Sequence, residues 1–157
     1  MSVGPITADD YAWVLDLNRA NEVATSPLDR AKLAQMIDAS FVAVALPQAA
    51  FLISFDQDAA YDSPNFLWFR ERLPRFVYVD RIVVSAQERG AGMARAFYEG
   101  LFDAARDAKH DCVVCEVNFD PPNPASDAFH AKLGFTQMGE ARLENGKGVR
   151  YLKRDLT

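Results

Sequence analysis

The chain has 157 residues, of which 50% are hydrophobic and 25% are charged. This length suits one domain of ordinary size, which can bury most of its apolar surface without disulfides or metals. The composition is typical of globular rather than disordered proteins. The formal net charge of −5 argues against nucleic acid as the main partner, because phosphate backbones are bound through clustered Lys and Arg. It mildly favours a cationic partner.

The N-terminal residues contain no basic segment followed by an apolar run, and no stretch approaches the ~20 apolar residues of a membrane span. We therefore expect a cytoplasmic protein without a membrane partner.

The first part of the chain predicts two helices followed by an antiparallel hairpin. Thr7 or Asp9 can cap the first helix, and Ser26-Pro27 is typical of a helix start. Short apolar runs separated by a Pro-Gln pair predict the two strands of the hairpin. The expected bounds are 7 or 9 to 19 for the first helix, 26 to 40 for the second, and 41–46 and 50–55 for the strands.

Residues 56–75 form a long connection that contains Tyr61, Phe66, Trp68 and Phe69 among acidic residues and amides. A loop of this length inside a compact domain is usually functional or disordered, and the aromatic content argues against disorder. We expect one short helical turn near 65–72. Two interpretations are open: a lid or wall of a binding site, or a packing cluster or dimer contact.

The next stretch combines a strand, a glycine-bearing turn and a helix. Residues 77–84 are rich in β-branched and aromatic side chains, which is typical of a buried strand. Gly90 and Gly92 follow, and residues 94–108 carry apolar side chains at helical spacing. Such a turn at a helix N-terminus binds anions, because its backbone N–H groups point outward and the helix dipole favours negative charge. A third glycine for a dinucleotide fingerprint, or a Gly-Lys-Ser/Thr ending for a phosphate loop, is missing.

Cys112 and Cys115 form a C-x-x-C pair inside a run that is typical of a β-strand. Residues three apart on a strand point to opposite faces of the sheet. We therefore expect two buried thiols rather than a redox pair, and no bound metal.

The last part of the chain predicts a strand, a helix and a closing hairpin. Asn123 can cap the helix, Gly134 is expected to end it, and Asn145-Gly146 is a hairpin turn signal. The whole order of elements indicates an α/β fold with a mixed sheet. The expected bounds here are 112–118, 124–134, 135–143 and 149–156.

Two motifs resemble those of the GNAT superfamily of acyl-CoA-dependent N-acetyltransferases. The pattern Arg89-x-x-Gly92-x-Ala94 resembles the pyrophosphate loop of that family. The segment 123–135 resembles its N-x-x-A/S-x-x-x-Y-x-x-x-G-F motif, with Ser126 at the small position and His130 where tyrosine is usual. The resemblance covers residues 11–156 and is closest to prokaryotic members whose acceptor is unassigned.

The resemblance implies a single-domain GNAT-like fold over residues 1–157. Its mixed central sheet is flanked by helices and has splayed parallel strands that admit the pantetheine arm of acetyl-CoA, the co-substrate. The glycine turn would hold the pyrophosphate, and main-chain groups of the strand before it would bind pantetheine and, at a bulge, polarise the acetyl carbonyl. The implied contacts are Ile82, Val83, Val84, Arg89, Gly90, Ala91, Gly92, Met93, Ala94, Asn123, Ser126 and His130.

Acetyl transfer to an amine needs a base for the amine and a proton for the departing thiolate. Asp80 and Glu116 are the candidate bases, since carboxylates in otherwise apolar strands are costly unless paired or functional. The alternative is an ion pair of either one with Arg81 or Arg150. His130 is the candidate acid, as imidazolium or through the N–H of neutral imidazole; alternatively it only packs against the cofactor.

Two functions remain open at this stage. The first is an enzyme that transfers acetyl from acetyl-CoA to a primary amine of a small molecule or peptide by direct attack. The second is a non-catalytic acyl-CoA-binding or regulatory domain. In the family, the connection 56–75 and the segment that contains Asn21 and Glu22 border the acceptor, although a solvated loop is the alternative for the latter. A homodimer is a further open interpretation.

Overall fold

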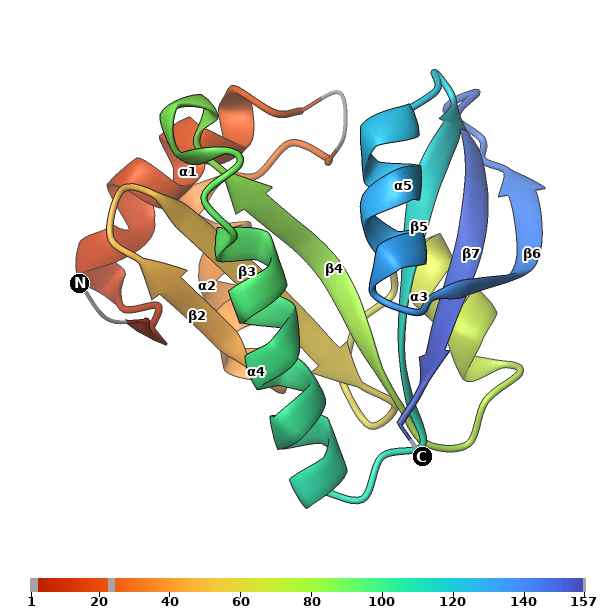
Figure 1. Ribbon diagram of the computed structural model, residues 1–157. Coiled ribbons are helices and arrows are strands. Elements are labelled where there is room, and N and C mark those ends of the chain that lie inside the picture. The colour runs from red at the N-terminus through yellow and green to blue at the C-terminus, as the bar shows by residue number, and fades with distance from the viewer. Residues whose placement is uncertain (1–2, 23–24, 157) are drawn as a thin grey trace.

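A seven-stranded mixed sheet with the order β1-β2-β3-β4-β5-β7-β6 organises the computed structural model (Figure 1). The structure describes residues 3–22 and 25–156. Within them β4 and β5 form the one parallel pair, and all other neighbouring strands are antiparallel. The strands are β1 Gly4–Pro5, β2 Ala43–Leu46, β3 Ala50–Asp56, β4 Phe76–Val84, β5 Cys112–Asp120, β6 Thr136–Arg142 and β7 Gly148–Asp155.

Helices cover both faces of this sheet. In Figure 1, α4 and α5 lie in front of the sheet, and α2 and α3 lie behind it. Each layer has its own buried cluster: Phe97 and Leu101 of α4 belong to one, and Leu33 of α2 and Phe66 of α3 belong to the other. The predicted α/β fold with a mixed, helix-flanked sheet is therefore confirmed. The helices are α1 Tyr11–Arg19, α2 Arg30–Ala39, α3 Pro64–Arg70, α4 Met93–Asp107 and α5 Pro124–Lys132. None of the described helices has the length and apolar character needed to cross a membrane.

Most elements lie within two residues of their expected bounds, but the start of α2 is a correction. The helix begins at Arg30 and not at Ser26-Pro27. Asp29 caps it, because its Oδ1 accepts a hydrogen bond of 2.7 Å from the backbone N–H of Lys32. Ser26 instead contacts a distant strand, as described below. Two short 3-10 turns, Ala8–Asp10 and Ala86–Glu88, and the strand β1 were not expected. Residues 23 and 24, within the expected polar break before α2, lie outside the described residues.

The two cysteines face opposite sides of β5, as strand alternation predicts. Cys112 belongs to the cluster behind the sheet and Cys115 to the cluster in front of it. Both are buried and unpaired by disulfide. Their side chains therefore cannot act on one metal or form one disulfide.

The aromatic connection between β3 and β4 folds largely inward. Phe66 and Phe69 are fully buried in the cluster behind the sheet. Trp68 stacks on Tyr151 of β7, with ring centroids 4.0 Å apart, and lies so close to β6 that a Cβ on Gly139 would meet its ring at 2.6 Å. Trp68 is thus a packing residue between α3 and the closing hairpin, which agrees with the packing interpretation of this connection.

Candidate active site

The strands β4 and β5 separate soon after they meet. They pair over only three positions, from Phe76 with Cys112 to Tyr78 with Val114, and then diverge (Figure 1). A narrow cavity of about 130 Å³ lies at this divergence and is lined by both strands, by Tyr98 of α4 and by His130 of α5. The predicted splay of the parallel strands is confirmed. Among residues 3–22 and 25–156, the main-chain edge of β4 that faces β5 has no strand partner beyond Tyr78.

β4 also carries a bulge at this point. Val79 lies opposite Ser54 and Arg81 lies opposite Ile53, so Asp80 is the extra residue on β4. The bulge was expected near residues 82–84, and it lies slightly earlier, at Asp80. Residues 82–84 themselves stay paired with β3 on their other edge.

The turn that follows β4 leaves the N-terminus of α4 uncovered. Gly90 and Gly92 have φ angles of 86° and 81°, in the left-handed region that glycine adopts without steric cost. Gly92 occupies the N-cap position, and no side chain caps the helix there. The first backbone N–H groups of α4 are therefore open to an anion. Arg89 lies beside this turn, where its Nη2 donates to Asn21 Oδ1 at 2.8 Å.

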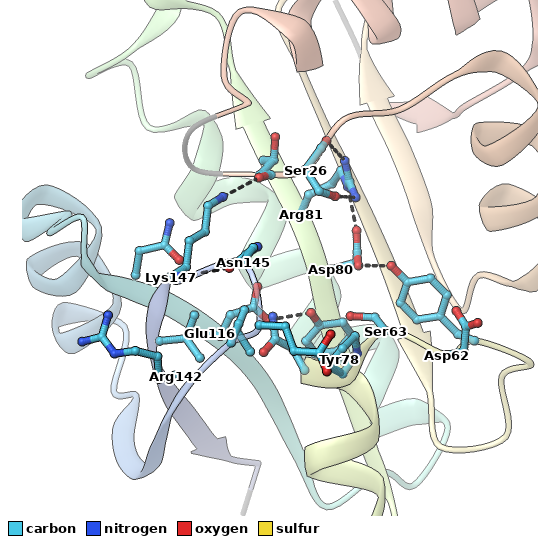
Figure 2. A pocket seen from close by; sticks show the side chains of 18 of the residues that line it. Ser26, Asp62, Ser63, Tyr78, Asp80, Arg81, Glu116, Arg142, Asn145 and Lys147 are labelled. Atoms are coloured by element: carbon cyan, nitrogen blue, oxygen red, sulfur yellow. Dashed lines mark hydrogen bonds and ion pairs between the residues drawn. The ribbon is translucent and has the colours of Figure 1, made fainter.

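Asp80 is held in a buried ion pair (Figure 2). The hydroxyl of Tyr61 donates to its Oδ1, and Arg81 Nε donates to its Oδ2 at 2.6 Å. The two charged side chains are only 5% and 3% exposed. Arg81 also donates to Asn18 Oδ1 at 2.9 Å and to the backbone and hydroxyl oxygens of Ser26 at 3.0 and 2.9 Å. Both carboxylate oxygens of Asp80 are therefore engaged in a network that ties β4 to α1 and to the segment before α2.

Glu116 lacks such a counterion. The hydroxyl of Tyr78 donates to Glu116 Oε1 at 2.5 Å (Figure 2), and no ion pair joins Glu116 to a basic side chain in the described part of the chain. Burial raises the pKa of Glu116 to about 8, with Asp80 also raising it and the Tyr78 hydroxyl lowering it. Arg150, the other expected counterion, pairs with Asp127 at 2.9 Å. With this pKa the Glu116 carboxyl group can gain or lose a proton near neutral pH.

His130 lies in the gap with both ring nitrogens engaged. Its Nδ1 is 2.8 Å from the backbone oxygen of Ser126, which can only accept, so Nδ1 carries a proton. Burial lowers the pKa of His130, with smaller opposing effects from Ser126 and Asp127. Its Nε2 lies 2.8 Å from the Tyr98 hydroxyl. In the neutral imidazole, Nε2 therefore accepts from Tyr98. Asn123 caps α5 as expected, accepting from the backbone N–H of Ser126 at 3.3 Å.

A groove of about 710 Å³ opens beside Glu116 (Figure 2). Its floor includes Tyr78, Asp80 and Glu116, and its walls come from residues 61–65 before and within α3, from residues 25 and 26, and from the β6–β7 turn. Lys147 of that turn donates to the backbone oxygen of Thr25 at 3.2 Å, which joins two of the walls. The connection 56–75 thus contributes a wall, but through residues 61–65 rather than through Trp68.

The sequence model of the acetyltransferase (GNAT) family matches residues 53–135, which is more than half of the chain. The chain belongs to the GNAT family of acetyltransferases. This confirms the enzyme class expected from the two motifs, with acetyl-CoA as the co-substrate. A search of curated proteins finds no match.

Solved structures show the same GNAT fold. Naa20 of Chaetomium thermophilum, in complex with a bisubstrate analogue, superposes with a TM-score of 0.78 at 16% identity, over 99% of this chain and 86% of that one. Ard1 of Thermoplasma volcanium gives 0.76 at 15%, over 99% and 97%. The putative acetyltransferase YncA of Salmonella typhimurium, with acetyl-CoA, gives 0.72 at 16%, over 100% and 94%. At these identities the likeness concerns the fold.

In this GNAT domain a tyrosine hydroxyl bonds to each titratable candidate that the sequence identifies. Tyr61 donates to Asp80, Tyr78 donates to Glu116, and Tyr98 pairs with His130. For Tyr78 a signal existed, because strand alternation places it on the same face as Asp80. Tyr61, Tyr98 and the amide of Asn18 carry no such signal, because they do not lie on the strand that carries Asp80. Of the two weak candidates after α1, Asn21 contacts Arg89 and Glu22 is exposed.

Proposed function

We propose that the chain is an N-acetyltransferase that moves the acetyl group of acetyl-CoA to a primary amine of a small molecule or peptide by direct attack, with Glu116 as the base. The observation that carries this proposal is the position of Glu116. It lines both the gap between β4 and β5 and the open groove beside it, as Asp80 also does, but it has no ion pair with a basic side chain in the described part of the chain. A thioester in the gap and an amine in the groove would therefore meet at this carboxyl group.

The cofactor side of the proposal rests on the gap and the turn beyond it. The pyrophosphate would bind the backbone N–H groups of residues 89–94, with Arg89 adding positive charge. The pantetheine arm would bind the unpaired main-chain edge of residues 82–84, and Asn123, Ser126 and His130 would border it from α5. The acetyl carbonyl would then lie near the bulge at Asp80, where a main-chain group can polarise it.

Glu116 suits the base better than Asp80 for a physical reason. Asp80 already satisfies Arg81 and Tyr61, so protonating it would leave a buried guanidinium without its counterion. Glu116, with a pKa of about 8, takes a proton near the pH at which an amine loses one. In the proposed step, neutral amine attacks the acetyl carbonyl, its proton passes to Glu116 directly or through water, and the C–S bond breaks.

For the departing thiolate we propose the pair of His130 and Tyr98 as the acid, in which Tyr98 gives the proton and His130 holds its hydroxyl in place. The proton that this pair can transfer is on the Tyr98 hydroxyl, which donates to His130 Nε2. Burial raises the pKa of Tyr98, so the hydroxyl is protonated before the reaction begins. Proton transfer gives the thiol and a phenolate, and solvent restores the phenolate. The non-catalytic alternative offers no reason for a carboxyl group that titrates near neutral pH at the junction of gap and groove.

The test is thiol release from acetyl-CoA across a panel of primary amines, with mass spectrometry of each product. The proposal predicts an acetylated amine and one free thiol per turnover. Tight binding of acetyl-CoA without any amine product would favour the non-catalytic alternative. We further propose a cytoplasmic location, which cell fractionation tests, and a homodimer, which sedimentation tests.

A further inference from the structure

Tyr151 lies directly beside the proposed base. In the β5–β7 ladder Glu116 is the cross-strand partner of Tyr151, so their side chains are neighbours on one face of the sheet. The Tyr151 ring stacks on Trp68 at 4.0 Å and meets Phe69 edge-on at 5.2 Å. Tyr151 is 1% exposed. Trp68 and Phe69 of α3 therefore hold the Tyr151 ring, and with it the hydroxyl, in place.

This hydroxyl fixes the side chain of Asn65. It donates a hydrogen bond of 2.9 Å to Asn65 Oδ1. In the reverse amide orientation the nitrogen would face the hydroxyl, and this hydrogen bond of the Tyr151 proton would be lost. A buried donor without a partner is costly. The oxygen of the amide therefore faces Tyr151.

The amide nitrogen of Asn65 is left to the groove. Asn65 lines the groove together with Glu116, and its Nδ2 makes no hydrogen bond to any part of the chain that the structure describes. Two N–H donors are thus presented beside the place where the amine is deprotonated. They match a hydrogen-bond acceptor on the substrate.

We propose that Asn65 determines acceptor specificity by donating a hydrogen bond to a carbonyl oxygen next to the reacting amine, so that the acceptor class is α-amino carbonyl compounds. This inference rests on the proposed acetyl transfer with Glu116 as base. A neutral carbonyl, as in an amino acid amide or a peptide N-terminus, fits better than a free carboxylate. Next to the reacting amine a carboxylate would lie beside ionised Glu116, which has no ion pair with a basic side chain in the described part of the chain.

The test compares glycinamide with ethylamine as acceptors, for the parent and for Asn65→Asp. Aspartate keeps an oxygen for the Tyr151 hydroxyl but replaces the amide N–H groups with a second acceptor. It also suits the first turn of a helix, so folding should be retained. The ratio of kcat/KM for glycinamide to that for ethylamine should fall about tenfold, the range expected for one lost hydrogen bond. The same two amines are used with the parent and with the variant. The difference between their pKa values therefore cancels when the two ratios are compared.

Asn145→Asp is the matched control. Asn145 lines the same groove on the β6–β7 turn and receives the same change of charge, but it does not touch Tyr151. Its ratio should stay near that of the parent. An unchanged ratio in Asn65→Asp, or an equal fall in Asn145→Asp, would overturn the inference. Failure of the parent to acetylate these two amines or any amine of the panel described above would instead overturn the proposed function, and this inference with it.

A further arm identifies the source of the carbonyl. Glycyl-alanine amide extends glycinamide beyond the same carbonyl group. A higher kcat/KM for the dipeptide indicates a peptide acceptor, and a lower one indicates a small molecule. In both cases the carbonyl-bearing acceptor must be preferred to ethylamine after correction for the unprotonated fraction of each amine, and absence of that preference contradicts the inference.

Discussion

Replacing Tyr78 with phenylalanine tests how Glu116 is tuned. The substitution removes the hydroxyl that donates to Glu116 Oε1 at 2.5 Å and leaves the buried ring in place. A hydrogen bond to a charged group is worth ~1.5–3 kcal/mol, and ~1.4 kcal/mol corresponds to one pKa unit. Since this bond stabilises the carboxylate, its loss should raise the pKa of Glu116 by about 1–2 units above its value of about 8.

The assay is the pH profile of kcat/KM with one fixed amine. A base acts when ionised, so activity falls as pH drops through its pKa. In Tyr78→Phe the acidic limb should move to higher pH while the plateau is largely kept. Tyr61→Phe is the matched control, because it removes the equivalent hydroxyl from Asp80. An acidic limb that moves in Tyr61→Phe and stays in Tyr78→Phe would refute the assignment of the base to Glu116.

Three further predictions concern the rest of the site. Gly92→Val should weaken acetyl-CoA binding in calorimetry, because a β-branched residue is strained at a φ of 81°; parental affinity would mean that the pyrophosphate binds elsewhere. The double variant Cys112→Ala, Cys115→Ala should keep its turnover if folded, because burial raises the pKa of Cys112 to about 11 and raises that of Cys115 as well; a trapped acetyl-cysteine would contradict direct transfer. His130→Phe should lower kcat by ~10²–10⁴-fold, a larger factor than its loss of CoA affinity. A parental kcat would remove His130 from the mechanism.

Local signals in the sequence were sufficient for most of the fold. Strand alternation placed Cys112 and Cys115 on opposite faces, and caps and turn residues located the ends of α5 and the closing hairpin. The start of α2 was missed because Ser26 looks like a cap locally. Its actual role is to accept hydrogen bonds from Arg81, 55 residues later in the chain.

The division of roles within the site depended on contacts that no local pattern encodes. The sequence supplied Asp80 and Glu116 as equal candidates, and Arg81 as a counterion for either. In the structure Asp80 is the carboxylate that pairs with Arg81. It lies at the bulge of β4 and also accepts a hydrogen bond from the hydroxyl of Tyr61. The direction in which Trp68 points was likewise set by packing against β7, which sequence periodicity in a short helix does not report.

The most direct test of the account compares kcat for Glu116→Gln with kcat for Asp80→Asn, at saturating acetyl-CoA and above the Glu116 pKa of about 8. Glutamine keeps an acceptor for the Tyr78 hydroxyl but cannot take the amine proton, so kcat should fall by ~10²–10⁴-fold. Asparagine still offers an oxygen within the Tyr61 and Arg81 network, and its loss of kcat should be clearly smaller once the folded fraction is measured. An equal or greater loss in Asp80→Asn would contradict the assignment of Glu116 as the base.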